Sequence, residues 1–341
     1  MSAQEGHYEG RLLVTGGAGF IGSNFVRLIL EREPRVQVTV LDKLTYAGNL
    51  ENLAGLDPDR LTFVKGDIAD PEVVARAMNG VRAVLNFAAE THVDRSIQNP
   101  GSFVLTDVYG SYVLLEAARR IQVERFIQIS TDEVYGEILG APATEEAPLM
   151  PRNPYSASKA GADRLAYSYY TTYGMPVVIT RCSNNYGPYQ HVEKLWPLFI
   201  TNALEDKPLP VYGSGQNLRD WVYVEDHCAA LHSLLVAPGV DGEVWNIGGG
   251  EERSSLEIGR LIVQALGKPE SLIRHVTDRP GHDRRYALDC SKIRDRLGFV
   301  PRTGFAAGAE RTIRWYQEHR GWWEKVKSGA FREYYEKAYR L

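Results

Sequence analysis

Two pairs of residues carry side chains suited to proton transfer. The stretch "STDEVYG" places Asp132 and Glu133 directly after a short apolar run. The stretch "NPYSASKAGADRLAYSYY" places Tyr155 and Lys159 four residues apart, so both lie on one face if it is helical. A neighbouring ammonium lowers the pKa of a tyrosine, so Tyr155 could accept a proton from a substrate hydroxyl. Each pair has an ordinary alternative, because acidic doublets often only solvate a turn and a tyrosine four residues before a lysine is common by chance.

A glycine-rich turn near the N-terminus could hold a dinucleotide for this chemistry. In "LLVTGGAGFIGSNFVRLIL", Gly16, Gly19 and Gly22 lie between an expected strand and an expected amphipathic helix. Glycine permits a tight turn and close approach to a pyrophosphate, and the helix N-terminus supplies free amides. Asp42 follows Gly22 by 20 residues and ends the next strand, where a carboxylate can bind ribose hydroxyls and repel a 2'-phosphate. The pattern favours NAD over NADP, with a strand-end turn cap as the alternative for Asp42.

Two later strand ends add residues to the same expected site. Asp67 in "KGDIAD" lies where it could reach the adenine, and Ala88 and Ala89 in "NFAAETHVDRS" are small enough to let a cofactor approach. Ordinary packing at the end of a strand is the alternative for all three.

Short apolar runs alternate with helical stretches through the first half, which is typical of parallel βαβ units. Strands are expected at "RLLVT", "VQVTVL", "LTFVK", "AVLNFA", "RFIQIS" and "PVVITR". Their nearly continuous apolar character predicts helices on both faces, hence an α/β fold with a doubly wound, Rossmann-type parallel sheet. We expect residues 1–183 to form the dinucleotide-binding domain, with returning segments near 220–248. Residues 184–341 are expected to form a smaller, discontinuous substrate domain, against which the aromatic segment after residue 314 packs.

Composition excludes several classes of partner. The 341 residues are 44% hydrophobic and 24% charged with a net charge of -4, which is typical of a soluble globular protein and gives no reason to expect nucleic acid or a membrane. Three cysteines, Cys182, Cys228 and Cys290, are too few for a disulfide framework and favour a cytoplasmic location. No export signal or spanning segment is expected. The eight histidines show no metal-ligand spacing, so no metal is expected.

Motifs along almost the whole chain, from about residue 11 to about residue 320, resemble the extended short-chain dehydrogenase/reductase family. They are "TGGAGFIG", "LDKLTYAGN", "AAETHVDRS", "STDEVYG", "YSASKA", "RCSNNYGPYQHVEKLWPLF", "RDWVYVEDH", "NIGGG" and "DRPGHDRRYALD". Within the family they are similar to the hydro-lyases that act on dTDP-glucose, because related epimerases usually carry small, uncharged residues where this chain has Asp132 and Glu133. The resemblance implies NAD as cofactor and a nucleotide-sugar-binding second domain.

The resemblance also implies a reaction. Tyr155, with Lys159, would deprotonate the hydroxyl on carbon 4 of the glucose while NAD accepts a hydride, and Thr131 would bind the sugar near that carbon. Glu133 would then remove the proton on carbon 5, while protonated Asp132 donates to the hydroxyl leaving carbon 6. Hydride returns to carbon 6 and a proton to carbon 5, giving a 4-keto-6-deoxy sugar. For Thr131 the alternative is a strand-end hydroxyl bonded to the backbone.

The residue-level match extends to binding positions. The implied cofactor contacts are Gly16, Gly19, Phe20, Ile21, Gly22, Asp42, Lys43, Leu44, Thr45, Asp67, Ile68, Phe87, Ala88, Ala89, Thr91, Thr106, Tyr155, Lys159 and Asn185. The implied substrate contacts are Thr91, Thr131, Asn184, Glu193, Lys194, Arg219, Asp278, Arg279 and His282. Cationic side chains suit a diphosphate at a domain interface. For Glu193 a solvated helix start is an equally good interpretation.

Three positions depart from the family pattern. Asp107 stands where asparagine is usual, which could disturb the proton relay or the pH optimum; Ser255 also replaces a common asparagine, and Thr91 replaces the commoner serine.

Other functions stay open at this point. They are a nucleotide-sugar epimerase or decarboxylase using Tyr155 and Lys159, or a non-catalytic NAD-binding regulator. The aromatics of "DRLAYSYYTTYG" are at helical spacing, which favours a core face over a partner surface. The resemblance nevertheless implies a homodimer built on this helix and on one from about residue 103 to about residue 120.

Overall fold

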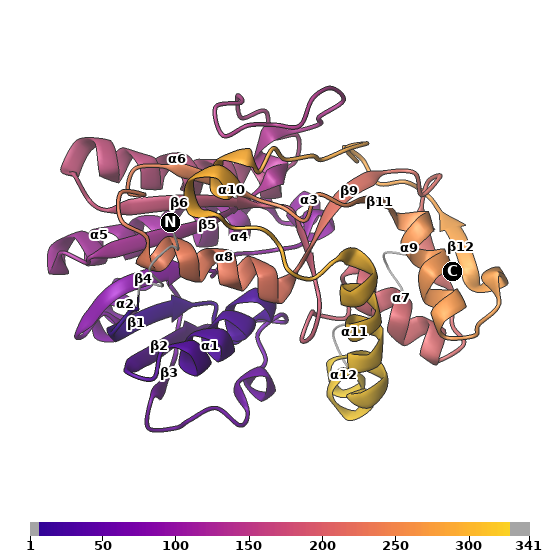
Figure 1. The fold of residues 1–341 in the computed structure, drawn as a ribbon, viewed down its shortest axis with the longest axis horizontal. Coiled ribbons are helices and arrows are strands. Elements are labelled where there is room, and N and C mark those ends of the chain that lie inside the picture. The colour runs from indigo at the N-terminus through magenta and orange to yellow at the C-terminus, as the bar shows by residue number, and fades with distance from the viewer. Residues whose placement is uncertain (1–6, 328–341) are drawn as a thin grey trace.

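The computed structural model describes residues 7–327 and centres on a seven-stranded sheet (Figure 1). Its order is β10-β6-β5-β4-β1-β2-β3, and every strand pair is parallel. The strands are β1 (Gly10–Thr15), β2 (Val36–Asp42), β3 (Leu61–Lys65), β4 (Val81–Asn86), β5 (Arg125–Thr131), β6 (Val177–Cys182) and β10 (Val244–Ile247). This confirms the predicted doubly wound parallel sheet.

Helices cover both faces of the sheet, as the apolar strands require. Helices α1 and α8 pack against each other, whereas α5 packs against α2 and α6 (Figure 1). The bounds are α1 (Phe20–Arg32), α2 (Pro71–Ala77), α3 (Val93–Gln98), α4 (Pro100–Phe103), α5 (Ser111–Ile121), α6 (Pro154–Tyr173), α8 (Val224–Val236) and α10 (Ser291–Leu297), with short 3-10 turns η1 (Leu50–Leu53) and η3 (Asp132–Tyr135).

The carboxyl ends of the central strands meet at one edge of the sheet. Thr15 at the end of β1 pairs with Leu41 of β2 and with Asn86 of β4, and Thr131 of β5 pairs with Cys182 of β6. Because ligands in open α/β sheets bind at this edge, the loops after these strands are where a site is expected.

A second lobe is built on two small sheets, ordered β11-β9-β7 and β12-β8 (Figure 1). The elements are β7 (Asn184–Tyr186), β8 (Leu209–Tyr212), β9 (Leu218–Tyr223), β11 (Glu252–Ser254), β12 (Ile273–Val276), η4 (Glu270–Leu272), α7 (Leu195–Leu204), α9 (Ser255–Ala265), α11 (Phe305–Glu318) and α12 (Arg320–Val326). Its core stacks Tyr186 on Trp196 and includes Trp323 of the C-terminal segment. Residues 328–341 of that segment lie outside the described residues. The chain returns to the large sheet through α8 and β10; the proposed boundary at residue 183 stays a prediction.

Two features of the helices differ from expectation. The expected helix from about residue 103 contains a π-helical turn, η2 (Val104–Gly110), before α5 begins. On α6 the predicted core face is wrong in part: Tyr169 is buried, but Tyr167, Tyr170 and Tyr173 are exposed. Packing against α5 covers only one stripe of α6, so the remaining aromatics face outward.

Candidate active site

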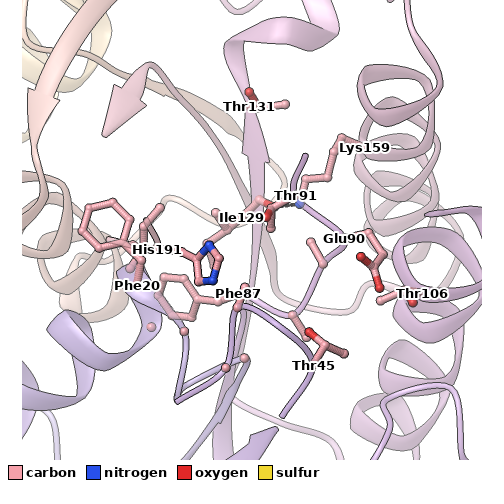
Figure 2. A pocket seen from close by; sticks show the side chains of 18 of the residues that line it. Phe20, Thr45, Phe87, Glu90, Thr91, Thr106, Ile129, Thr131, Lys159 and His191 are labelled. Carbon is pink, nitrogen blue, oxygen red and sulfur yellow. Dashed lines mark hydrogen bonds between the residues drawn. The ribbon is translucent and has the colours of Figure 1, made fainter. Parts of the chain in front are cut away.

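A cavity of about 290 Å³ opens at the carboxyl edge of the sheet and contains the glycine-rich turn (Figure 2). In the view of Figure 2, Thr131 and Lys159 lie at the top of the cavity and Thr45 at the bottom. The cavity therefore runs from the loop after β2 to the end of β5 and the start of α6.

The glycine-rich turn is packed too closely against backbone to carry side chains at Gly16 or Gly22. Gly16 adopts a positive φ of 65°, and a Cβ there would lie 2.7 Å from the backbone nitrogen of Ala88. A Cβ on Gly22 would lie 2.4 Å from the carbonyl oxygen of Gly16. The turn thus brings backbone, without side chains, to the start of α1, where free amides favour a phosphate.

Asp42, the last residue of β2, is buried beside the glycine-rich turn. Asp42 Oδ2 accepts a hydrogen bond from the Ala18 amide at 2.9 Å, and Oδ1 accepts one from the Leu44 amide at 2.8 Å. Burial nevertheless raises the pKa of Asp42, against the lowering effect of these two bonds. The turn-cap alternative is therefore observed, and because Asp42 also lines the cavity it can accept further hydrogen bonds there. Asp67 lines the cavity as well and forms an ion pair with Lys43 at 2.6 Å.

All but one of the predicted cofactor residues line this cavity. The exception is Leu44, whose backbone turns through a positive φ of 56° and whose amide holds Asp42. The cavity is also lined by Glu90, Gln190 and His191, for which the sequence offered no signal beyond their position in loops after strands.

The acid pair ends β5 with the two carboxyl groups in different environments. Asp132 is 3% exposed; its Oδ1 accepts a hydrogen bond from Thr131 Oγ1 at 3.1 Å, and its Oδ2 is buried without a hydrogen-bond partner among the described residues. Burial, reinforced by the charge of Glu133, raises the pKa of Asp132 to about 8. Asp132 is therefore a neutral carboxylic acid at neutral pH, which is what a proton donor needs.

Glu133 is half-buried and is reached from two sides. Its Oε2 lies 3.4 Å from Asn153 Nδ2 and 3.4 Å from the Tyr286 hydroxyl. Its backbone amide donates to Thr131 Oγ1 at 3.3 Å, which caps η3. The Thr131 hydroxyl thus makes the backbone contact of the ordinary alternative while it also lines the cavity.

Tyr155 and Lys159 lie on one face of α6 and both line the cavity, but their electrostatics differ from expectation. Burial, followed by the carboxylate of Glu133, raises the pKa of Tyr155 well above its ordinary value. Lys159 is 5% exposed and donates from Nζ to the carbonyl oxygen of Ile129 at 2.7 Å. The predicted lowering of the Tyr155 pKa by Lys159 is therefore wrong for the protein alone, because desolvation outweighs it.

A second cavity, of about 170 Å³, adjoins the first and extends into the second lobe. Glu133, Asn184, Lys194 and Thr91 line both cavities. Of the predicted substrate residues, the second cavity is lined by Thr91, Asn184, Glu193, Lys194, Arg219, Arg279 and His282, together with Ser255. Thr131 lines only the first cavity. Asp278 lines neither; its Oδ1 lies 2.7 Å from His282 Nδ1 and accepts from the Arg279 amide, so it contacts two residues of the second cavity.

The second cavity is walled by buried charges. Burial lowers the pKa of Lys194 and of Arg219, with the carboxylate of Glu133 among the groups that oppose this. Arg279 lies 3.5 Å from Asp94, and its Nε is buried with no hydrogen-bond partner within residues 7–327. Glu193 is fully buried at its side chain and pairs with Arg95, which contradicts the solvated helix start. Three cations around one cavity, of which Arg219 is buried, suit a diphosphate.

Asp107 lies on the π-helical turn behind Lys159 and is 1% exposed. Its Oδ2 accepts from Ser158 Oγ at 2.6 Å, and its Oδ1 accepts from the Glu90 amide at 3.0 Å. Burial raises the pKa of Asp107 to about 6, although the charge of Lys159 opposes the shift. A carboxyl whose pKa is raised in the folded state binds more protons than in the unfolded chain, so stability falls as pH rises from about 4 to about 6.

The Asp107→Asn variant should therefore be more stable than the parent protein at pH 8, by about 1–3 kcal/mol, and equally stable below pH 4. The amide can keep both contacts, because Ser158 can accept from it while donating to the Tyr155 carbonyl oxygen. Urea unfolding at the two pH values measures the difference. A variant less stable at pH 8 would show that attraction to Lys159 exceeds the cost of burial.

Comparisons with known proteins agree with this geometry. A family model described as GDP-mannose 4,6 dehydratase matches residues 13–312. The chain is 52% identical over 323 residues to a dTDP-glucose 4,6-dehydratase of Streptomyces niveus, covering 93% of this chain and 96% of that one. It is similar to the crystal structure of the dTDP-glucose 4,6-dehydratase DesIV of Streptomyces venezuelae with NAD and TYD bound, with a TM-score of 0.90, 53% identity and coverage of 93% and 100%. It is also similar to UDP-glucose 4-epimerase of Thermus thermophilus in complex with NAD, with a TM-score of 0.83, 33% identity and coverage of 91% and 99%.

Proposed function

The chain belongs to the extended short-chain dehydrogenase/reductase family, among its nucleotide-sugar dehydratases and epimerases, and on that basis we propose that it converts dTDP-glucose to dTDP-4-keto-6-deoxyglucose. The enzyme is a hydro-lyase, and its cofactor is NAD. Its substrate is the nucleotide sugar that its dehydratase relatives are named for.

One observation carries the assignment within the family. Glu133 lines both cavities, and beside it Asp132 is held in the acid form by burial. A carboxylate and a protonated carboxyl side by side, at the junction of a cofactor cavity and a cation-walled cavity, support removal of a proton and a hydroxyl from adjacent carbons.

The first half of the reaction is proton transfer at carbon 4. When bound, NAD⁺ supplies the hydride acceptor for carbon 4 and later the donor for carbon 6, and its positive charge favours the phenolate of a tyrosine lining its cavity. Tyr155 removes the proton from the carbon 4 hydroxyl. Thr131, at the end of β5, binds the same oxygen, and Lys159, on the same helix α6 as Tyr155, supplies a positive charge in the same cavity.

The second half is elimination across carbons 5 and 6. The ketone at carbon 4 acidifies the proton on carbon 5, and Glu133 removes it. Asp132 gives its proton to the hydroxyl on carbon 6, which leaves as water. After hydride reaches carbon 6, Glu133 returns a proton to carbon 5.

Binding divides between the two cavities. The first cavity holds NAD on the glycine-rich turn, with Asp42 toward the adenosine ribose. The second holds the nucleotide diphosphate, with Lys194, Arg219 and Arg279 as its cations. Residues 1–183 and 184–341 form the two binding domains in this proposal.

Two rival functions are less well supported. An epimerase would use Tyr155 and Lys159 but has no need for a protonated Asp132 beside Glu133, and the epimerase relative is less similar, at 33% identity. A non-catalytic NAD-binding regulator has no use for four reactive side chains lining one cavity.

The protein acts as a homodimer in this proposal, through the face formed by η2, α5 and α6. That face exposes an aliphatic and aromatic set comprising Val104, Leu105, Tyr109, Tyr112, Tyr167, Tyr170 and Tyr173. Sedimentation velocity should give twice the 38.2 kDa of one chain.

In this proposal the protein is cytoplasmic, because a reducing compartment suits its three unpaired cysteines, Cys182, Cys228 and Cys290. Within residues 7–327, no helix has the length and apolar character that crossing a membrane requires.

The test is conversion of dTDP-glucose without added reductant. The purified protein, supplied with NAD, should form a product with the alkaline absorbance of a 4-keto-6-deoxy sugar, with no net NADH. Formation of dTDP-galactose instead would assign the chain to the epimerases, and absence of any conversion would support the regulator.

A further inference from the structure

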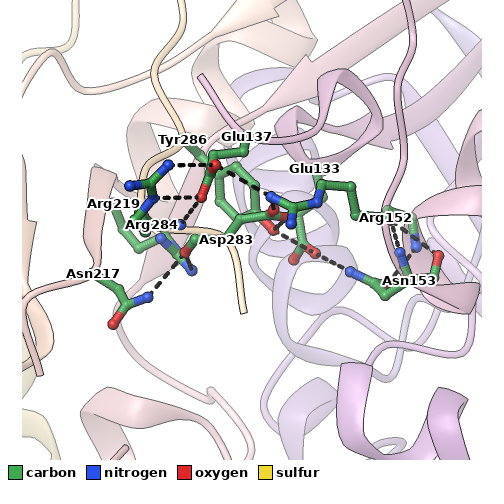
Figure 3. A network of polar contacts seen from close by, with 10 residues as sticks. Glu133, Glu137, Arg152, Asn153, Asn217, Arg219, Asp283, Arg284 and Tyr286 are labelled. Carbon is green, nitrogen blue, oxygen red and sulfur yellow. Dashed lines mark hydrogen bonds and ion pairs between the residues drawn. The ribbon is translucent and has the colours of Figure 1, made fainter. Parts of the chain in front are cut away.

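Tyr286 belongs to the loop between β12 and α10, yet its hydroxyl lies beside the acid pair at the end of β5 (Figure 3). Its hydroxyl oxygen is 3.4 Å from Glu133 Oε2, and the residue is 2% exposed. The proposed function gives this side chain no task. It is the one described tyrosine whose hydroxyl reaches Glu133 within hydrogen-bonding distance.

Two side chains fix Tyr286. The hydroxyl donates to Asp283 Oδ2 at 2.6 Å, and the Arg219 guanidinium lies over the ring at 4.2 Å from its centre. Asp283 is itself 1% exposed, and its Oδ1 accepts from Arg152 Nη1 at 2.7 Å. Figure 3 shows these side chains converging on Glu133 from the segment before α6 and from the second lobe. A hydroxyl held in this way cannot turn without breaking a buried contact.

The single proton of this hydroxyl has two carboxylates within reach. The contact to Asp283 is 0.8 Å shorter than the contact to Glu133, so the proton lies on the line to Asp283. Burial, followed by the charge of Glu133, raises the pKa of Tyr286 far above its ordinary value, so the hydroxyl keeps its proton. What Tyr286 presents to Glu133 is therefore an oxygen lone pair.

A lone pair at this position can form a hydrogen bond with Glu133 only after Glu133 has taken up a proton. As a carboxylate, Glu133 accepts a hydrogen bond from Asn153 Nδ2. This donor is fixed because Asn153 caps the start of α6. As a carboxylic acid, Glu133 becomes a donor, and the Tyr286 oxygen can accept from it. An interaction that strengthens as the proton arrives lowers the barrier to proton removal, because it is made in the later state and not in the earlier one.

Resting on the proposed dehydration, we propose that Tyr286 is a positioning residue for Glu133. Its hydroxyl oxygen, with its own proton committed to Asp283, accepts a hydrogen bond from the acid form of Glu133 and holds that form in place until the proton returns to carbon 5. In the assisted step the carbon 5 proton moves to Glu133, the electron pair of that bond forms the double bond between carbons 5 and 6, and water leaves carbon 6 with the proton from Asp132.

The test is single-turnover kinetics of Tyr286→Phe, which keeps the ring beneath Arg219 and removes only the hydroxyl. Tyr186→Phe is the matched control, because Tyr186 is equally buried in the same lobe and donates to the carbonyl oxygen of Phe305, which lines neither cavity. With dTDP-glucose, NADH should form in Tyr286→Phe at a rate within about twofold of the control. Its disappearance into product should be slower by about 10- to 100-fold, so NADH accumulates during the turnover.

A double variant separates positioning from packing. If Tyr286 acts through Glu133, then Glu133→Gln combined with Tyr286→Phe should be no slower than Glu133→Gln alone. Full additive slowing in the double variant would overturn the inference, as would equal slowing of NADH formation and decay in Tyr286→Phe or an unchanged rate of decay. If the parent protein and Tyr186→Phe both leave dTDP-glucose unconverted, the proposed function itself fails and this inference falls with it.

Discussion

Replacing Glu133 by Gln should stop water loss while leaving hydride transfer from carbon 4 intact. The amide can still accept from Asn153, so the segment keeps its structure, but it cannot take up the proton from carbon 5. Product formation should fall by about 10²- to 10⁴-fold, the range for loss of a general base. Because the sugar is oxidised but not dehydrated, the reduced nicotinamide should accumulate on the protein.

The measurement is nicotinamide absorbance and product formation in one stopped-flow experiment with dTDP-glucose. Glu124→Gln is the matched control, since Glu124 directly precedes the first residue of that strand and pairs with exposed Arg82. Product formation by Glu133→Gln at the rate of the control would show that another group is the base.

Asp132→Asn should lower activity and raise stability at the same time. The amide oxygen keeps the hydrogen bond from Thr131, but the variant cannot protonate the hydroxyl that leaves carbon 6. Product formation should fall by about 10²- to 10⁴-fold. The gain in stability arises because burial makes the carboxylate form of Asp132 costly in the folded protein.

The sign of the stability effect depends on pH. In the unfolded chain Asp132 loses its proton near pH 4, whereas in the folded protein its pKa is raised to about 8 by burial and by Glu133. Between these values the folded state binds more protons, so the parent protein loses stability as pH rises. Asparagine does not titrate, so the variant should be more stable than the parent by about 2–5 kcal/mol above pH 8, with the difference lost below pH 4. Guanidinium unfolding at both pH values measures it, and equal stability above pH 8 would mean that Asp132 ionises without cost.

The parallel sheet could be predicted because the sequence of each strand is itself mostly apolar and rich in β-branched residues. "VQVTVL" predicts a strand over residues 36–41 and forms β2 (Val36–Asp42), since a strand covered on both faces is mostly apolar and rich in β-branched residues, as this one is apart from exposed Gln37. The glycine-rich turn is equally local, so the predicted cofactor residues that line the first cavity followed from it and from the family resemblance.

Features that depend on distant contacts could not be predicted in this way. The pKa of Tyr155 follows from burial and from Glu133, which lies 22 positions earlier in the chain, and not from Lys159 on the same helix. The π-helical turn that carries Asp107 packs against α6, and no local pattern marks it. Tyr286 is separated from Glu133 by 153 residues, so its contact exists only after the second lobe has folded against the first.

The central claim is that one hydride leaves carbon 4 and returns to carbon 6 of the same sugar. The most direct test is incubation of the NAD-loaded protein with dTDP-glucose that carries deuterium at carbon 4, followed by NMR of the product. We expect the deuterium in the carbon 6 methyl group of a 4-keto-6-deoxy product. Loss of the label to solvent, or a product that keeps the carbon 6 hydroxyl, would contradict the account.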